Sequence, residues 1–161
     1  MFSVLISIYY KEKPEHFDAC MKSIWDQQTL KPTEIVLVED GPLTTELYES
    51  IALWSERLQQ NLRIIKLEDN VGTGKAKNIG LQYCQNDIVF IVDTDDISVS
   101  DRFEKQMKCF EADDELVILG GQITEFTDDI SSLSGMRIVP LDNLALREYA
   151  KKQSPFNNMT I

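Results

Sequence analysis

Residues 88–96 read Ile88-Val89-Phe90-Ile91-Val92-Asp93-Thr94-Asp95-Asp96, an apolar run that passes directly into three carboxylates. An apolar run of this kind is typical of a strand that is covered on both faces, as in a parallel sheet. In an open parallel sheet, ligands bind outside the carboxyl ends of the strands. The stretch therefore predicts the fold class and also the edge of the sheet at which a ligand site lies.

Strand and helix patterns alternate on the amino-terminal side of this stretch, which indicates a single α/β domain up to about residue 125. Three upstream apolar runs predict strands, at residues 2–9, 34–38 and 62–67. Downstream, an apolar helical stripe follows residue 100, and Ser98 or Ser100 is its expected N-cap. The apolar residues 116–121 predict a further strand, and a short helix is expected over residues 144–151.

The chain of 161 residues carries 27 acidic and 16 basic side chains, for a formal net charge of -11. A surface this negative repels the phosphate backbone of nucleic acids and anionic lipid headgroups. We therefore expect no nucleic-acid partner. Solubility is an equally good explanation of the acidic surface.

The three cysteines lie far apart, at positions 20, 84 and 109, with no spacing that suggests zinc. They predict buried free thiols in a reducing compartment. The apolar run at residues 2–10 is too short to span a bilayer and has no basic segment before it. A cytoplasmic location is therefore the expectation for this part of the protein.

Polar residues follow three of the predicted strands: Tyr10-Lys11-Glu12, Glu39-Asp40-Gly41 and Asp93-Thr94-Asp95-Asp96. Clustered carboxylates repel one another unless a cation offsets their charge. Mg²⁺ and Mn²⁺ favour oxygen ligands, and the chain has a single histidine, His16. The alternative is an acidic turn at a helix N-terminus, and Asp40 alone is equally compatible with a turn before Gly-Pro.

The segment of residues 70–80 contains Gly74-Lys75 but lacks the spacing of a phosphate-binding Walker A loop. It is better interpreted as a loop that begins a helix, from which Lys75 or Lys77 faces a diphosphate. Solvated surface lysines are the alternative for both.

Taken in order, these motifs resemble family 2 glycosyltransferases of the GT-A fold. The matching motifs are Val38-Glu39-Asp40-Gly41, then Asn70-x-Gly72-x-x-x-Ala76-Lys77-Asn78-x-Gly80, Val92-Asp93-Thr94-Asp95-Asp96 and Arg102-Phe103. The most similar subgroup makes bacterial capsule, exopolysaccharide or O-antigen. The resemblance implies a Rossmann-like, mostly parallel sheet flanked by helices, as one nucleotide-sugar-binding domain over residues 1–161.

The resemblance also implies inverting transfer of a sugar from a nucleoside diphosphate sugar, often UDP-linked, to a saccharide or lipid-linked saccharide acceptor. Asp95 and Asp93 would bind the Mg²⁺ or Mn²⁺, with Asp96 beside the sugar. The full set of donor-binding positions that it implies is Ser7, Ile8, Tyr9, Glu12, Asp40, Lys77, Asp93, Asp95 and Asp96. Peripheral association with the inner face of the membrane would come from regions outside this chain.

Two departures from the family pattern bear on function. Lys11 stands where the family often has asparagine, and the general base is expected beyond Ile161. The chain thus looks truncated before the acceptor region. A nucleotide-sugar-binding module without catalysis is therefore one alternative. A phosphatase of the haloacid dehalogenase type is another, although its nucleophile normally follows the first strand, where this chain has Tyr10-Lys11-Glu12.

Overall fold

The computed structural model describes residues 1–127 and 129–161, which divide into two compact units, Met1–Asp114 and Glu115–Ile161. The first unit is an α/β sheet with helices on both faces, and the second is a hairpin with a short helix. A single nucleotide-sugar-binding domain over residues 1–161 stays a prediction.

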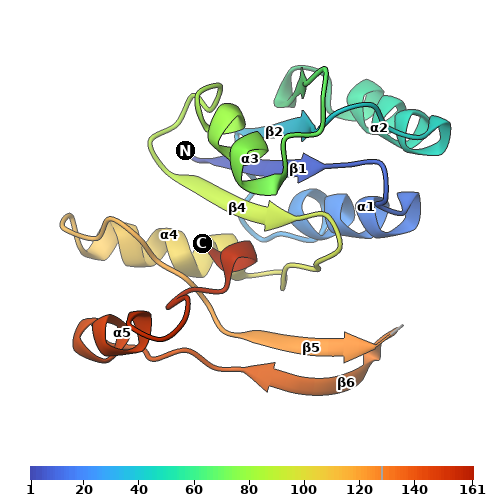
Figure 1. The fold of residues 1–161 in the computed structure, drawn as a ribbon. Coiled ribbons are helices and arrows are strands. Elements are labelled where there is room, and N and C mark those ends of the chain that lie inside the picture. The colour runs from blue at the N-terminus through green and yellow to red at the C-terminus, as the bar shows by residue number, and fades with distance from the viewer. Residues whose placement is uncertain (128) are drawn as a thin grey trace. The chain divides into compact units, whose positions relative to one another are not determined.

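The sheet of the first unit has the expected four strands, all parallel, in the order β3-β2-β1-β4. Their bounds are Ser3–Ile8 for β1, Glu34–Glu39 for β2, Leu62–Lys66 for β3 and Val89–Asp93 for β4. β1 is central, and its register places Ile8 beside Glu39 and Ser7 beside Asp93. The polar strand ends therefore meet at one edge of the sheet (Figure 1).

Helices cover the two faces of the sheet unequally (Figure 1). On one face lie α1 (Pro14–Met21), continued by the π-helical turn η1 (Lys22–Asp26), α2 (Thr45–Leu58) and α4 (Arg102–Ala112). The 3₁₀ turn η2 (Gln59–Asn61) links α2 to β3. Aromatic rings of Phe2, Phe90 and Phe103 pack together in this larger core. α1 begins with Pro14, a position at which the missing N–H of proline costs no helical hydrogen bond.

The opposite face is covered by α3 (Thr73–Leu81), which lies very close to the sheet. A Cβ atom at Gly80 would lie 2.5 Å from Val38 Cγ2 and 2.6 Å from Leu5 Cδ1. Contacts that short are not sterically allowed, so the absence of a side chain at Gly80 lets the helix sit on β1 and β2. This close packing fixes the direction in which the first turn of α3 points.

The expected cap of α4 is wrong. The helix begins at Arg102, and its N-cap Asp101 makes no side-chain capping hydrogen bond. Ser98 has a different role: its N–H donates to Ser23 Oγ, and its hydroxyl accepts a hydrogen bond from Arg102 Nη1. The loop before α4 is therefore held by tertiary hydrogen bonds, which local sequence rules do not report.

The second unit contains β5 (Ile123–Thr127) and β6 (Asp129–Arg137), which pair antiparallel, followed by α5 (Asn143–Ala150) and the 3₁₀ turn η3 (Asn158–Thr160). The helix was expected at this place. The strand expected at residues 116–121 is wrong, since these residues form no ladder and Val117 is 89% exposed. Gly121 donates its N–H to Thr160 Oγ1, so a side chain satisfies its backbone.

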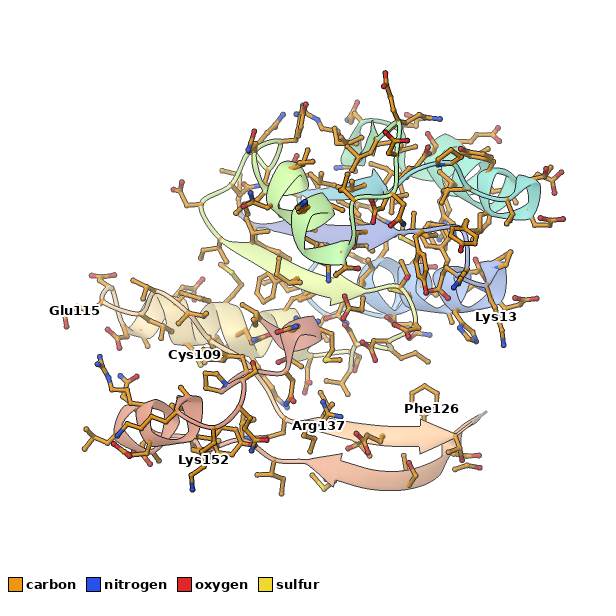
Figure 2. All side chains as sticks on the ribbon, viewed as in Figure 1. Lys13, Cys109, Glu115, Phe126, Arg137 and Lys152 are labelled. Atoms are coloured by element: carbon orange, nitrogen blue, oxygen red, sulfur yellow. The ribbon has the colours of Figure 1, made fainter. Side chains whose placement is uncertain are left out.

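The cysteines are free, as expected, but only Cys20 is buried. Cys84 is half-buried in the turn after α3, and Cys109 is exposed on α4 (Figure 2). None of the helices within the described ranges has the length and apolar character needed to cross a membrane.

Candidate donor site at the carboxyl edge of the sheet

A cavity of about 410 Å³ lies beyond the carboxyl ends of β1 and β4, within the first unit. Figure 2 shows Lys13, one of its lining residues, in the connection from β1 to α1. The complete lining is Ser7, Tyr9, Lys11, Glu12, Lys13, His16, Thr73, Asp93, Thr94 and Asp95. The position agrees with the rule that ligands bind outside the carboxyl ends of parallel strands.

Five of the sequence-predicted site residues line this cavity: Ser7, Tyr9, Glu12, Asp93 and Asp95. The other four lie around it without forming its wall. Ile8 is buried in the core, and its carbonyl oxygen accepts a hydrogen bond from the N–H of Asp40. Asp40, Lys77 and Asp96 each bond to or interact electrostatically with neighbouring parts of the site.

Asp40 is 3% exposed and anchors the loop that leads into α3. Its two carboxylate oxygens accept hydrogen bonds from the N–H groups of Val71, at 2.7 Å, and Gly72, at 3.0 Å. Gly72 has φ +87°, a left-handed conformation that favours glycine. A carboxylate has about four lone-pair positions, so Asp40 keeps acceptor capacity beyond these two bonds.

The acidic turn Asp93–Asp96 and the loop after β1 both contribute side chains to the lining of the cavity. Lys77, on α3, forms an ion pair with Asp93 Oδ1. Burial, together with the Asp95 and Asp93 carboxylates, raises the pKa of Asp96 from its ordinary 3.8 to about 6, against the opposing effect of Arg102 and Lys77. Burial and the like charges of the turn thus both disfavour the ionised form of Asp96.

Glu12 connects the loop after β1 to the acidic turn after β4. Thr94, which is buried, donates a hydrogen bond from Oγ1 to Glu12 Oε2 at 2.6 Å. The other oxygen, Oε1, accepts a hydrogen bond from the N–H of Lys13 at 2.8 Å and lies 3.3 Å from His16 Nδ1. The loop after β1 and the turn after β4 are thus fixed relative to each other by one carboxylate.

Arg102 lies behind the acidic turn, with its guanidinium close to the rings of Phe90 and Phe103. It donates hydrogen bonds to the carbonyl oxygen of Ile91, to Ser98 Oγ and to Gln106 Oε1. Burial lowers the pKa of Arg102 to about 10, while the charges of nearby acidic groups oppose that shift. A fixed cation under the turn reduces the repulsion among its aspartates.

Five of the cavity's residues were assigned no binding role from the sequence: Lys11, Lys13, His16, Thr73 and Thr94. Lys11 and Thr94 had been named only as members of the polar motifs after the strands. Thr73 opens α3, at the helix end that favours anions. The spacing of His16 four residues after Glu12 on a helical segment was the available signal for that pair.

The donor atoms of the acidic turn fit a hard divalent cation. Asp93 and Asp95 both line the cavity, and they offer carboxylate oxygens. Across the described part of the chain, no three His, Cys, Asp or Glu side chains are gathered into a closed metal cage. Mg²⁺ commonly binds through one or two carboxylates with water and substrate phosphates, which is the arrangement that two cavity-lining aspartates offer.

Known proteins place this fold and site in context. The chain matches the family described as Glycosyl transferase family 2 over residues 3–160. It is 43% identical over 161 residues to the amylovoran biosynthesis glycosyltransferase AmsE of Erwinia amylovora, covering 100% of this chain and 59% of that protein. It is 34% identical over 160 residues to an Escherichia coli UDP-Gal:alpha-D-GlcNAc-diphosphoundecaprenol beta-1,3-galactosyltransferase, covering 99% of this chain and 57% of that enzyme.

Among solved structures, Staphylococcus aureus TarS residues 1–349 in complex with UDP-GlcNAc superposes with a TM-score of 0.57 at 26% identity. The match covers 69% of this chain and 31% of that one. These likenesses confirm the expected GT-A fold, with a mostly parallel sheet flanked by helices. The chain spans less than two thirds of the length of these relatives.

Proposed function

Because the chain belongs to glycosyl transferase family 2, we propose that it is the donor-binding part of an enzyme that transfers a sugar from a nucleoside diphosphate sugar. The acceptor is a saccharide hydroxyl in the synthesis of a bacterial surface polysaccharide. The observation that carries the proposal is the cavity in which Asp93 and Asp95 face Ser7, Tyr9 and Glu12. An acidic wall and a polar wall of one pocket suit the two ends of a nucleotide sugar.

The nucleoside end of the donor is assigned to the loop after β1 and to Asp40. Tyr9 is exposed in the cavity and offers an aromatic face, and Ser7 lines the same cavity, while Ile8 supports the site through its carbonyl oxygen, which accepts from the N–H of Asp40. Asp40 uses its remaining acceptor capacity toward the base or ribose. UDP is the proposed nucleotide, since the similar galactosyltransferase uses a UDP-sugar and TarS binds UDP-GlcNAc.

The diphosphate end is assigned to the acidic turn. Asp93 and Asp95 hold a Mg²⁺ or Mn²⁺ that stabilises the negative charge of the departing diphosphate. Lys77 adds a second positive charge on the same side, and Asp96 faces the sugar. Arg102 keeps the turn in place from behind. In this arrangement the residues bind the donor and prepare its leaving group.

Transfer with inversion needs a general base on the opposite face of the sugar to accept the proton of the acceptor hydroxyl. We assign that base to a part of the enzyme outside these residues, as the family resemblance implies. A lipid-linked saccharide is a natural acceptor class, because the similar galactosyltransferase acts on a diphosphoundecaprenol-linked sugar. Such an acceptor would bring the enzyme to the inner face of the membrane.

A nucleotide-sugar-binding module without transfer remains the second candidate, since the residues assigned here bind the donor and none of them is assigned as the general base. The two candidates share the donor site and differ only in turnover. No observation favours the phosphatase: Glu12, near the expected place of its nucleophile, is hydrogen-bonded to Thr94.

The proposal is tested by thermal unfolding with and without nucleotide and Mn²⁺. At a ligand concentration of about 100 times Kd, UDP with Mn²⁺ should raise the melting temperature by roughly 5 °C. Asp95→Ala should abolish this shift. Asp87→Ala is the matched control, since Asp87 is exposed just before β4 and carries the same charge.

A screen of UDP-, GDP- and dTDP-sugars by the same measurement would identify the donor class. If none of these nucleotides produces a metal-dependent shift in the melting temperature, the proposed donor site is wrong. Rapid hydrolysis of a generic phosphate ester with Mg²⁺ would instead favour the phosphatase.

A further inference from the structure

Lys77 is turned inward to the acidic cluster. Its side chain is 12% exposed and its ammonium pairs with Asp93 Oδ1, while the Asp93 side chain is 30% exposed and lines the cavity. Lys77 itself contributes nothing to the cavity wall. A lysine that is not part of the cavity wall therefore covers one oxygen of a proposed metal ligand.

Lys77 is nevertheless within reach of the cavity. Thr73 lies one turn earlier on α3 and lines the cavity, and residues four apart on a helix share one face. The first turn of α3 is held in place by the two hydrogen bonds from Val71 and Gly72 to Asp40. The Lys77 ammonium already contacts Asp93, which lines the cavity, while the segment leading into its helix is anchored.

The two cations beside the acidic turn are held very differently. Arg102 is buried, and three of its guanidinium nitrogens donate to three separate acceptors. The recorded partner of the Lys77 ammonium within the described ranges is the single Asp93 carboxylate. Arg102 is therefore a fixed charge, whereas the Lys77 ammonium is exchangeable.

We propose that Lys77 is the internal counter-ion of Asp93 in the cation-free protein, and that it moves to the donor's diphosphate when a divalent cation takes Asp93. This inference rests on the proposed function. The cation and Lys77 compete for the same carboxylate, so the pair weakens binding of the cation alone. Once displaced, the ammonium is available to the phosphates, so cation and nucleoside diphosphate strengthen each other's binding reciprocally.

The test is Mn²⁺ binding measured with and without saturating UDP, from the electron paramagnetic resonance signal of free Mn²⁺. Lys77→Met should bind Mn²⁺ alone about tenfold more tightly than wild type, a typical scale for coupling between two sites. It should bind UDP alone more weakly. The strengthening of Mn²⁺ binding by UDP should shrink in the variant, while chelation of Mn²⁺ by UDP in solution is the same for all proteins.

Two controls separate this effect from charge and folding. Lys105→Met removes the same charge from an exposed pair with Asp101 on the far side of the sheet, and should leave both affinities at the wild-type value. Lys77→Arg keeps a cation beside Asp93 and should bind Mn²⁺ alone as wild type does. Thermal unfolding in EDTA verifies that each variant is folded.

One outcome would overturn the exchange and leave the donor site intact. In that outcome the wild-type protein binds both ligands, but Lys77→Met binds Mn²⁺ alone with the same affinity as wild type or a weaker one. Lys77 would then be a permanent structural partner of Asp93. Wild-type protein that binds neither ligand would overturn the proposed function and the exchange together.

Discussion

Both ends of the parallel sheet carry carboxylates, but the carboxylates at the two ends have very different surroundings. At the amino end Glu34 is 7% exposed, and its Oε1 accepts hydrogen bonds from Ser3 Oγ at 2.6 Å and from the N–H of Gln85 at 2.5 Å. Asn86 Nδ2 donates to the same Ser3 hydroxyl at 3.0 Å. At the carboxyl end three aspartates crowd one turn, and two of them face a cavity.

This difference separates structural charge from functional charge. The protein satisfies Glu34 from two segments of the chain, Ser3 on β1 and Gln85-Asn86 after α3, so that end of the sheet needs no solute. At the acidic turn, burial and then the neighbouring Asp95 and Asp93 carboxylates raise the pKa of Asp96, so its ionised form is disfavoured there. Carboxylates that a protein does not neutralise itself favour an external cation, and this is the physical basis of the donor-site assignment.

Removal of the buried Glu34 carboxylate should have the largest effect on stability. Glu34→Ala should lower the free energy of unfolding by about 3 kcal/mol, because the Ser3 hydroxyl and the Gln85 N–H lose their acceptor in a buried place. Glu34→Gln keeps a side-chain oxygen and should cost about 1 kcal/mol. Urea unfolding measures both. The structural role of Glu34 is contradicted if the two variants are equally stable. It is also contradicted if folded Glu34→Ala no longer shows a melting-temperature shift with UDP and Mn²⁺.

At the carboxyl end of the sheet, Asp96 should have a smaller effect on stability, and that effect should depend on pH. The pKa of Asp96 is raised by folding, so ionised Asp96 opposes folding, and stability falls as pH rises from about 4 through about 6. Asp96→Asn should therefore stabilise the protein by about 2 kcal/mol at about pH 7.5 and by almost nothing at about pH 4. Thermal unfolding in EDTA measures this.

Asp87→Asn is the charge-matched control for that experiment, and it should show no such pH dependence. A stabilisation by Asp96→Asn that is equal at both pH values would contradict repulsion within the turn. It would indicate instead that the amide forms new hydrogen bonds.

The sequence predicted the parallel sheet well, because apolar runs such as residues 34–38 become strands only when both faces are covered. The run at residues 116–121 carries the same local signal but forms no strand. Gly120 lies against Phe156, where a Cβ would come within 2.7 Å of Cδ1, and Gly121 bonds to Thr160. Those contacts come from a segment about 35 residues later, and periodicity does not detect them.

The candidate site was predicted where chemistry and position coincide, at the cavity-lining Asp93 and Asp95. It was missed where a residue's role depends on a partner distant in sequence. Thr94 bonds to Glu12 across 82 positions, and Lys77 on α3 pairs with Asp93 at the end of β4. The anchoring of residues 71 and 72 by Asp40 is likewise visible only in three dimensions.

The central claim is that a divalent cation and a nucleoside diphosphate bind at the carboxyl end of the sheet and nowhere near its amino end. The most direct test is paramagnetic broadening of backbone amide signals by substoichiometric Mn²⁺ in the presence of UDP. Signals of Thr73 and residues 93–96 should disappear first, while those of Ser3, Glu34 and Asn86 persist. Broadening centred on Glu34, or spread evenly over the chain, would contradict the account.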